Sequence, residues 1–137
     1  LKSVSDKKLS NLIMKPQQPK KHMPAVWSIT DVSLVLLKKL DLFKTVIPSK
    51  IFECMAMSVP IILGVEGEVK DIIKSANTGL CIEPESSEEL SKAIVRLKND
   101  HFLTKSLGKN GRVCVEREFN REILASEYLK ILEKISS

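Results

Sequence analysis

The residues best suited to chemistry lie where a short helix is expected to begin, in the stretch VIPSKIFECMAMSVPIIL at 46–63. Pro48 stiffens the entry to this helix, Ser49 can cap it or donate a hydrogen bond to a phosphate, and Lys50 adds a positive charge. A helix N-terminus offers unpaired N–H groups and a partial positive charge, so it holds phosphate well. This helix start is therefore a candidate phosphate site.

A single carboxylate, Glu53, lies one turn inside the same helix. Its side chain is expected to point back toward the helix start. A carboxylate repels phosphate, but it can accept two hydrogen bonds from a ribose diol that lies just beyond the phosphates. The alternative is a solvent-facing acid that complements the helix dipole. The spacing alone leaves both interpretations open.

The elements that must position these residues are read from short, nearly continuous apolar runs, which are typical of strands buried on both faces of a parallel sheet. Helical patterns lie between the runs, and Ser86 and Glu89 predict a reciprocal capping box. The fold class predicted is α/β, a partial doubly wound (Rossmann-like) parallel sheet of about four strands with two carboxyl-terminal helices. The chain forms a single incomplete domain, 1–137. Its strands are expected near 12–14, 32–37, 60–63 and 80–82, and its helical tail at 100–136.

In such sheets, ligands bind beyond the carboxyl ends of the strands. Two loops are expected there. The first, 38–49, contains Lys44 and Thr45 and leads into the candidate helix. The second contains Gly64 and Gly67, which allow the backbone to approach a ligand closely.

The charge is unevenly distributed, with about +7 in residues 1–50 and about −2 in the remainder. The basic part could meet phosphates, a nucleic acid or an anionic membrane face, or its lysines could simply be solvated. Aromatic residues make up only 4% of the chain and do not interleave with the lysines, so no nucleic-acid partner is expected. Three cysteines in apolar surroundings and two histidines give no metal-ligand pattern. They fit a reduced, cytoplasmic compartment.

Three segments together resemble a known family: PSKIFECMAMSVPIIL, GEVKDIIKSANTGLCIEPESSEELSKAIVRL and NGRVCVEREFN. They are similar to the carboxyl-terminal, donor-binding domain of family 4 retaining glycosyltransferases of the GT-B fold, of the bacterial surface-polysaccharide type. PAVWSITDVSLVLLKKL fits as the short helix and strand before the donor loop. The resemblance covers residues 11–135, and the 46–63 block is its specific part.

The resemblance implies roles for the candidate residues. Glu53 matches the second Glu of a Glu-x7-Glu motif, which binds the nucleotide ribose. Pro48, Ser49 and Lys50 match the loop and helix start that bind the donor diphosphate. The implied donor is a UDP-sugar, with a GDP-sugar as the alternative. The implied reaction transfers the sugar to a lipid-linked or saccharide acceptor in polysaccharide or lipopolysaccharide biosynthesis, with no metal or other cofactor.

The sequence departs from the family pattern at three positions. Thr45 stands where the first Glu of the motif, which contacts the donor sugar, is expected; Thr45 and Gly67 are kept as candidate donor-binding residues. Ser58 replaces a common Gly at the helix end, where a left-handed residue is favoured, at a cost of about 1 kcal/mol. Asp71 replaces a Glu in the following helix, which is conservative.

The resemblance also implies missing partners: an amino-terminal acceptor domain and two further strands of the donor domain. The strand at 32–37 should then have a bare edge, which is an association hazard. We expect either edge-to-edge pairing with a second copy or an amino-terminal segment that covers the edge. The chain alone is expected to be inactive, because chemistry across a cleft needs both walls.

Two further alternatives stay open. The chain could be a non-catalytic nucleotide- or phosphate-binding α/β module, or a truncated remnant. A cytoplasmic protein could also touch the inner membrane face peripherally through the lysines at 15–21. A receiver-like signalling domain is disfavoured, because it would need an acidic cluster after its first strand.

Overall fold

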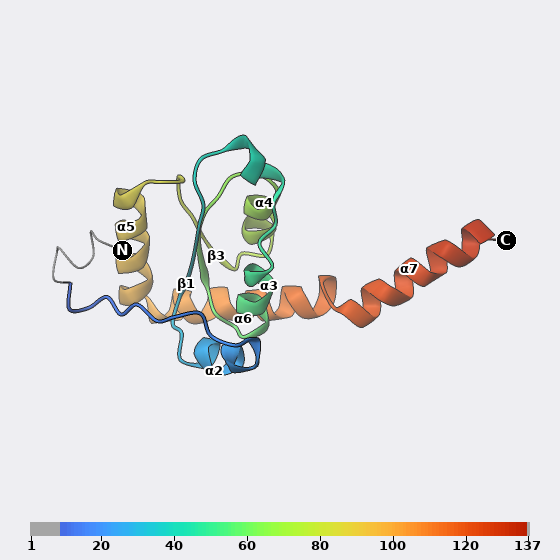
Figure 1. Ribbon diagram of the computed structural model, residues 1–137, viewed down its shortest axis with the longest axis horizontal. Coiled ribbons are helices and arrows are strands. Elements are labelled where there is room, and N and C mark those ends of the chain that lie inside the picture. Colours follow the sequence, from blue (N-terminus) through green and yellow to red (C-terminus); the bar gives the residue numbers. More distant parts are fainter. Residues whose placement is uncertain (1–8, 137) are drawn as a thin grey trace.

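In a computed structural model, which describes residues 9–136, a small parallel sheet is surrounded by helices (Figure 1). Strands alternate with helices up to residue 81, and helices follow to the end. The elements are η1 (Lys20–His22), α2 (Met23–Ser28), β1 (Ser33–Leu36), η2 (Asp41–Thr45), α3 (Lys50–Ala56), β2 (Ile61–Gly64), α4 (Glu68–Ser75), β3 (Gly79–Cys81), α5 (Ser87–Asn99), α6 (His101–Glu118) and α7 (Arg121–Ser136).

The three strands are parallel and lie in the order β1-β2-β3. β1 pairs with β2 through Ser33 opposite Ile61, and β2 pairs with β3 through Ile61 opposite Gly79. Helices α3 and α4 connect the strands and pack on one face, and α5 covers the other (Figure 1). The α/β prediction of a partial Rossmann-like sheet is confirmed, with three strands instead of about four.

The core is divided by β2, whose four residues are all buried. Ile61 and Leu63 join the cluster beneath α3 and α4, whereas Ile62 joins the cluster beneath α5 and α6. This alternation is what a strand covered on both faces requires. It explains why the sequence shows a continuous apolar run here.

Helix α6 lies against the residues that precede β2 and β3, and glycine makes this approach possible. A Cβ on Gly108 would lie 2.1 Å from the Ser58 carbonyl oxygen. Ser58 has a φ of 56°, so the expected left-handed residue at the end of α3 is confirmed. Arg112 also donates to the Ala56 carbonyl at that helix end.

The strand predicted at 12–14 does not form. Leu12, Ile13 and Met14 are exposed and have no regular secondary structure. Three apolar residues cannot make a strand without a neighbouring strand to share hydrogen bonds. Within the described chain, the outer edge of β1 is therefore unpaired, and residues 9–32 do not add a strand that covers it.

The predicted capping box at Ser86 and Glu89 forms only in part. Ser86 accepts a hydrogen bond from the Glu89 N–H at 3.2 Å. The Glu89 carboxylate, however, accepts from the Glu83 N–H at 2.7 Å and not from Ser86, so the box is not reciprocal. Asn120 caps α7 by accepting from the Glu122 N–H at 2.9 Å.

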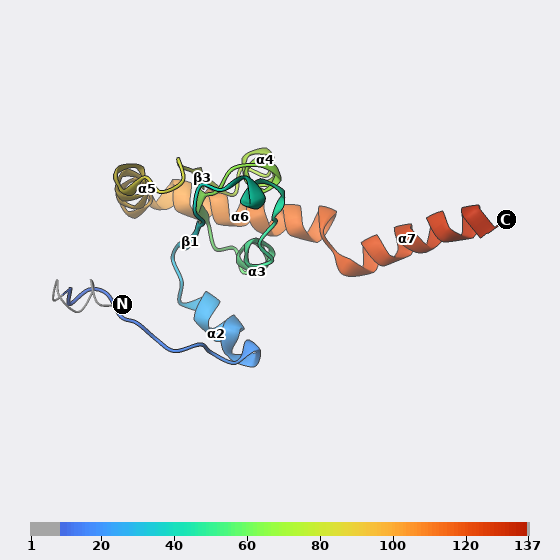
Figure 2. The same cartoon turned by 45° about the horizontal axis from the view of Figure 1, so that its top comes forward.

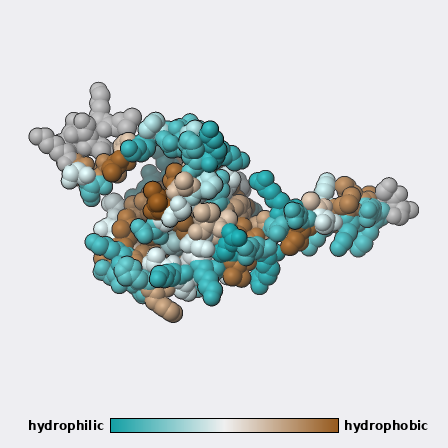
Figure 3. Space-filling model, turned by 90° about the horizontal axis from the view of Figure 1, so that it is seen from below, coloured by the Kyte–Doolittle hydropathy of each residue, from teal (hydrophilic) through white to brown (hydrophobic). Residues whose placement is uncertain are grey.

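Helix α7 extends away from the body of the molecule, and α2 lies to one side of the sheet (Figure 2). Residues 121–135 of α7 are all exposed. Hydrophobic and hydrophilic groups lie side by side on this projecting helix (Figure 3). Its apolar members include Leu124, Tyr128, Ile131 and Ile135. Among residues 9–136, no helix combines the length and the apolar character that crossing a membrane requires.

Candidate functional site

The loop that follows β1 is packed against the start of α4. Gly67, the N-cap residue of α4, has φ 90° and ψ −158°. A Cβ at this position would lie 1.9 Å from the Lys44 carbonyl oxygen. A residue with a side chain could fit here only if the loop moved. Thr45, whose hydroxyl donates to the Leu42 carbonyl at 3.4 Å, is therefore held beside Gly67 at the carboxyl edge of the sheet.

A second set of contacts joins the loop after β1 to the loop after β3. The Lys39 ammonium pairs with the Glu83 carboxylate, and the Lys39 N–H donates to the Glu85 carboxylate at 3.1 Å. The hydrogen bond from Lys39 holds the pKa of Glu83 below its usual range, and the same contact raises the pKa of Lys39. Both side chains are exposed, so this pair orients the loops more than it stabilises the fold.

Lys44 is also paired. Its ammonium lies 2.7 Å from the Asp41 carboxylate within η2, and the hydrogen bond to this carboxylate raises the pKa of Lys44. Lys50, by contrast, makes no ion pair within residues 9–136. Of these three cations, Lys50 is the one without a paired carboxylate among the residues that the structure describes.

The first turn of α3 is formed by backbone contacts. The Ile51 N–H donates to the Pro48 carbonyl at 3.0 Å, and the Phe52 N–H donates to the Ser49 carbonyl at 3.1 Å. Ser49 occupies the N-cap position, but within the described chain its hydroxyl makes no capping hydrogen bond. The Ser49 hydroxyl is therefore not used by the helix itself within the described residues.

Glu53 is exposed on α3, on the side away from the buried Ile51, Cys54 and Met55. One of its oxygens, Oε2, accepts a hydrogen bond from Trp27 Nε1 at 3.2 Å. The indole of Trp27 is thus in contact with the candidate ribose ligand. No sequence spacing signals this contact, because the two residues are 26 positions apart.

A pocket of about 360 Å³ opens beside this carboxylate, which is within the range of small-molecule sites. It lies between α2, the end of α3 and the start of α7. Its lining residues are Lys20, Met23, Pro24, Trp27, Glu53, Ala56, Met57 and Arg121.

The structure places the predicted site residues in separate positions. Pro48, Ser49 and Lys50 lie at the start of α3 and do not line the pocket beside Glu53. The Glu53 carboxylate contacts Trp27 of α2 and borders a pocket formed with the end of α3 and the start of α7, so the structure does not bring it together with the helix start as the sequence predicted. Thr45 and Gly67 lie together at the start of α4 and do not line that pocket.

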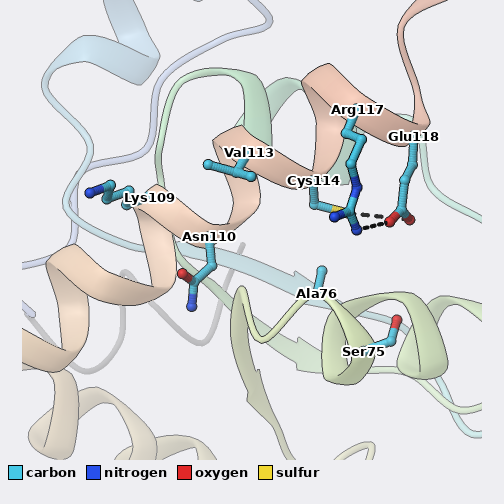
Figure 4. Close-up of a pocket in the computed structure, with 8 residues that line it drawn as sticks. All are labelled: Ser75, Ala76, Lys109, Asn110, Val113, Cys114, Arg117 and Glu118. Atoms are coloured by element: carbon cyan, nitrogen blue, oxygen red, sulfur yellow. Dashed lines mark hydrogen bonds and ion pairs between the residues drawn. The ribbon is translucent and has the colours of Figure 1, made fainter.

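A different hollow lies between the end of α4 and α6, lined by Lys109, Asn110, Cys114 and neighbouring side chains (Figure 4). Arg117 and Glu118 pair with each other at its rim. Burial raises the pKa of the Cys114 thiol, so this sulfur is a poor nucleophile. None of the predicted site residues lines this hollow.

The chain matches the family model of the group 1 glycosyl transferases over residues 2–113. It is 32% identical over 81 residues to a GDP-mannose-dependent monoacylated alpha-(1-6)-phosphatidylinositol monomannoside mannosyltransferase of Corynebacterium glutamicum. It is 33% identical over 76 residues to the capsular polysaccharide biosynthesis glycosyltransferase CapM of Staphylococcus aureus. These matches cover 59% and 55% of this chain. The chain spans about a fifth of the length of these curated relatives, 21% and 20%.

Two solved structures share the fold. Sucrose-phosphate synthase from Thermosynechococcus elongatus superposes on 98% of this chain with a TM-score of 0.77 and 23% identity, and 33% of that chain is covered. The C-terminal domain of the group 1 family glycosyl transferase LpcC from Francisella tularensis superposes on 88% with a TM-score of 0.70 and 20% identity, and 60% of that chain is covered.

Proposed function

Because the chain belongs to the group 1 glycosyltransferases, whose model matches residues 2–113, we propose that it is the donor-binding part of such an enzyme. Within that family, it corresponds to the carboxyl-terminal domain of a family 4 retaining member. The donor is a nucleotide sugar, a UDP-sugar with a GDP-sugar as the alternative. The parent enzyme transfers the sugar to a lipid-linked or saccharide acceptor in polysaccharide or lipopolysaccharide biosynthesis.

The observation that carries this proposal is the family match, because the matched range contains all of the candidate site residues. The geometry supports it. The diphosphate lies at the start of α3, where the free charge of Lys50 and the Ser49 hydroxyl add to the partial positive charge of the helix end. Glu53 lies one turn further along and accepts from the ribose hydroxyls.

The acceptor side of the reaction belongs to a further part of the enzyme. A sugar is transferred across a cleft, so this chain alone binds the donor and does not turn it over. The protein acts at the cytoplasmic side, and the lysines at 15–21 offer a peripheral contact with an anionic membrane face. A non-catalytic nucleotide-binding module is the second candidate, since it needs the same donor contacts and no acceptor wall.

Calorimetric titration of the chain with UDP and with GDP tests the donor site. Replacing Glu53 with Gln removes the charge that accepts from the ribose. Hydrogen bonds to charged groups contribute about 1.5–3 kcal/mol, so Glu53→Gln should weaken binding by about ten- to a hundredfold. Glu127→Gln, an exposed acid on α7, is the matched control and should leave the affinity unchanged.

Binding of neither nucleotide would contradict the proposed donor site. Equal affinities of wild type and Glu53→Gln would remove the ribose role of Glu53. Donor hydrolysis or sugar transfer by this chain alone would contradict the proposal that it binds the donor but needs the acceptor part of the enzyme for turnover.

A further inference from the structure

The contact between Trp27 and Glu53 joins the proposed donor site to the core. Trp27 is the only tryptophan in the chain and is 9% exposed, packed in the same cluster as Val35, Ile51 and Cys54. Its Nε1 donates to Glu53 Oε2 at 3.2 Å. A tryptophan in such surroundings has little freedom to move, so the direction of its N–H is fixed.

The helix that carries Glu53 is equally fixed. Ile51, Cys54 and Met55 are completely buried, which prevents α3 from rotating about its axis. An exposed glutamate would otherwise sample several rotamers and lose that freedom when it binds a ligand. In this structure the Glu53 side chain has already lost much of this conformational freedom on folding, because the indole N–H of Trp27 holds one carboxylate oxygen.

The second carboxylate oxygen, Oε1, makes no hydrogen bond within residues 9–136. It belongs to an exposed side chain that borders the pocket between α2 and α3. The carboxylate therefore has one oxygen engaged by the protein and one available to a donor from outside.

We propose that Trp27 is a positioning residue for the nucleotide ribose: its indole N–H orients the Glu53 carboxylate so that the free oxygen accepts from the ribose hydroxyls. This inference rests on the proposed function, because it requires that Glu53 binds ribose. Trp27 itself makes no contact with the ribose. Its effect on affinity therefore passes entirely through Glu53.

A purely structural role gives a different expectation. A buried indole N–H needs an acceptor, and Glu53 could serve only that purpose. In that case, losing the N–H would change the stability of the fold and would affect all nucleotides alike. A positioning role affects only ligands that carry the ribose hydroxyls.

The discriminating experiment measures the affinity for UDP and for 2′,3′-dideoxyuridine 5′-diphosphate, which lacks both ribose hydroxyls. Trp27→Phe keeps an aromatic ring in the core and removes the N–H. Ordering a side chain at a binding site reduces affinity by about two- to tenfold, so Trp27→Phe should weaken UDP binding by that factor. Its affinity for the dideoxy compound should equal that of wild type.

A double-mutant cycle adds an independent readout. In the Glu53→Ala background, Trp27→Phe should cause no further loss of UDP affinity. Phe119→Leu is the packing control, because the Phe119 ring packs against the Phe52 ring in a tilted arrangement, with ring centroids 4.7 Å apart. It should lower the melting temperature and leave both affinities unchanged.

Fluorescence of the wild-type protein tests the same proposal without a core substitution. All tryptophan emission comes from Trp27, whose N–H is bonded to the carboxylate that receives the ribose. UDP should change this emission, the dideoxy compound should change it much less, and Glu53→Ala should abolish the difference between them.

The outcomes separate this inference from the proposed function. If wild type binds neither UDP nor GDP, the proposed function fails and the role of Trp27 fails with it. If UDP binding depends on Glu53 but not on Trp27, only the positioning role is overturned. If Trp27→Phe weakens the affinity for UDP and for the dideoxy compound equally, Trp27 has only a structural role. If only GDP binds, the same measurements are made with GDP and 2′,3′-dideoxyguanosine 5′-diphosphate in place of the two uridine compounds.

Discussion

Replacing Gly67 with Ala should destabilise the protein strongly, because two independent penalties act at this residue. Its backbone has φ 90° and ψ −158°, a region that is essentially restricted to glycine and costs about 1–3 kcal/mol for other residues. The new Cβ would also lie 1.9 Å from the Lys44 carbonyl oxygen and 2.6 Å from the Lys44 Cα. These are backbone atoms, so the η2 loop must move.

The expected loss follows from these terms. Adding the displacement of the loop to the backbone penalty gives about 3 kcal/mol or more, against a total stability of about 5–15 kcal/mol for a domain. For a chain of this size, the melting temperature should fall by about 10 °C. Urea unfolding followed by circular dichroism measures the free energy directly, provided that the m-value is unchanged.

Gly64→Ala is the matched control in the preceding strand. Its Cβ would meet only the end of the Leu36 side chain, Cδ2 at 2.9 Å, and side-chain atoms of Ile82. Its φ is not positive. The exposed Leu36 side chain can rotate away, so this variant should stay within about 1 kcal/mol of wild type. The reasoning is refuted if Gly67→Ala loses no more stability than Gly64→Ala.

Three further results are expected. Because Lys39 lowers the pKa of Glu83, the pair contributes stability at neutral pH, and this contribution is lost as the pH falls through the lowered pKa. A carbon-13 NMR titration should show that Lys39→Met raises the Glu83 pKa back toward its usual value. An unchanged Glu83 pKa would contradict the contact. The unpaired edge of β1 should let two copies associate, so light scattering after size exclusion should detect a dimer that the double variant Leu34→Lys, Leu36→Lys loses; a wild-type monomer would refute edge pairing. Removing residues 122–137 should change the melting temperature by less than about 2 °C, because residues 121–135 of this helix are exposed; a larger fall would reveal packing of α7.

The sheet could be predicted from the sequence because each of its strands is a compact apolar run. The runs at 32–37, 60–63 and 80–82 became β1, β2 and β3 with small shifts of their ends. The apolar run at 12–14 did not form a strand, because strand formation depends on a neighbouring strand that the local residues do not specify. Patterns of hydrophobicity report burial, and they report pairing only indirectly.

The candidate site was predictable only where its residues are close in sequence. Pro48, Ser49 and Lys50 are adjacent, and the helix they begin was expected in the same place. The contacts of Glu53 with Trp27 and of Lys39 with Glu83 join residues 26 and 44 positions apart. Such contacts arise from the packing of elements, and no spacing rule reveals them.

The position of Glu53 suits two roles within the fold. Its charge complements the positive end of α3, and its Oε2 satisfies the indole N–H of Trp27. Neither role uses Oε1. An acid that served only the helix dipole could be replaced by any first-turn acid without regard to Trp27. The hydrogen bond from Trp27 holds one carboxylate oxygen, which complementing the dipole does not require.

The contacts that shape the proposed site all lie within this chain, whereas its uncovered apolar surfaces lie elsewhere. Gly67 packs on Lys44, and Trp27 bonds to Glu53, without any contribution from the free edge of β1. On that strand, Leu34 and Leu36 remain 42% and 44% exposed. A partner that covers this edge would therefore stabilise the sheet and leave these two contacts unchanged. Donor binding should accordingly persist in the isolated chain, and sugar transfer should require the second wall of the cleft.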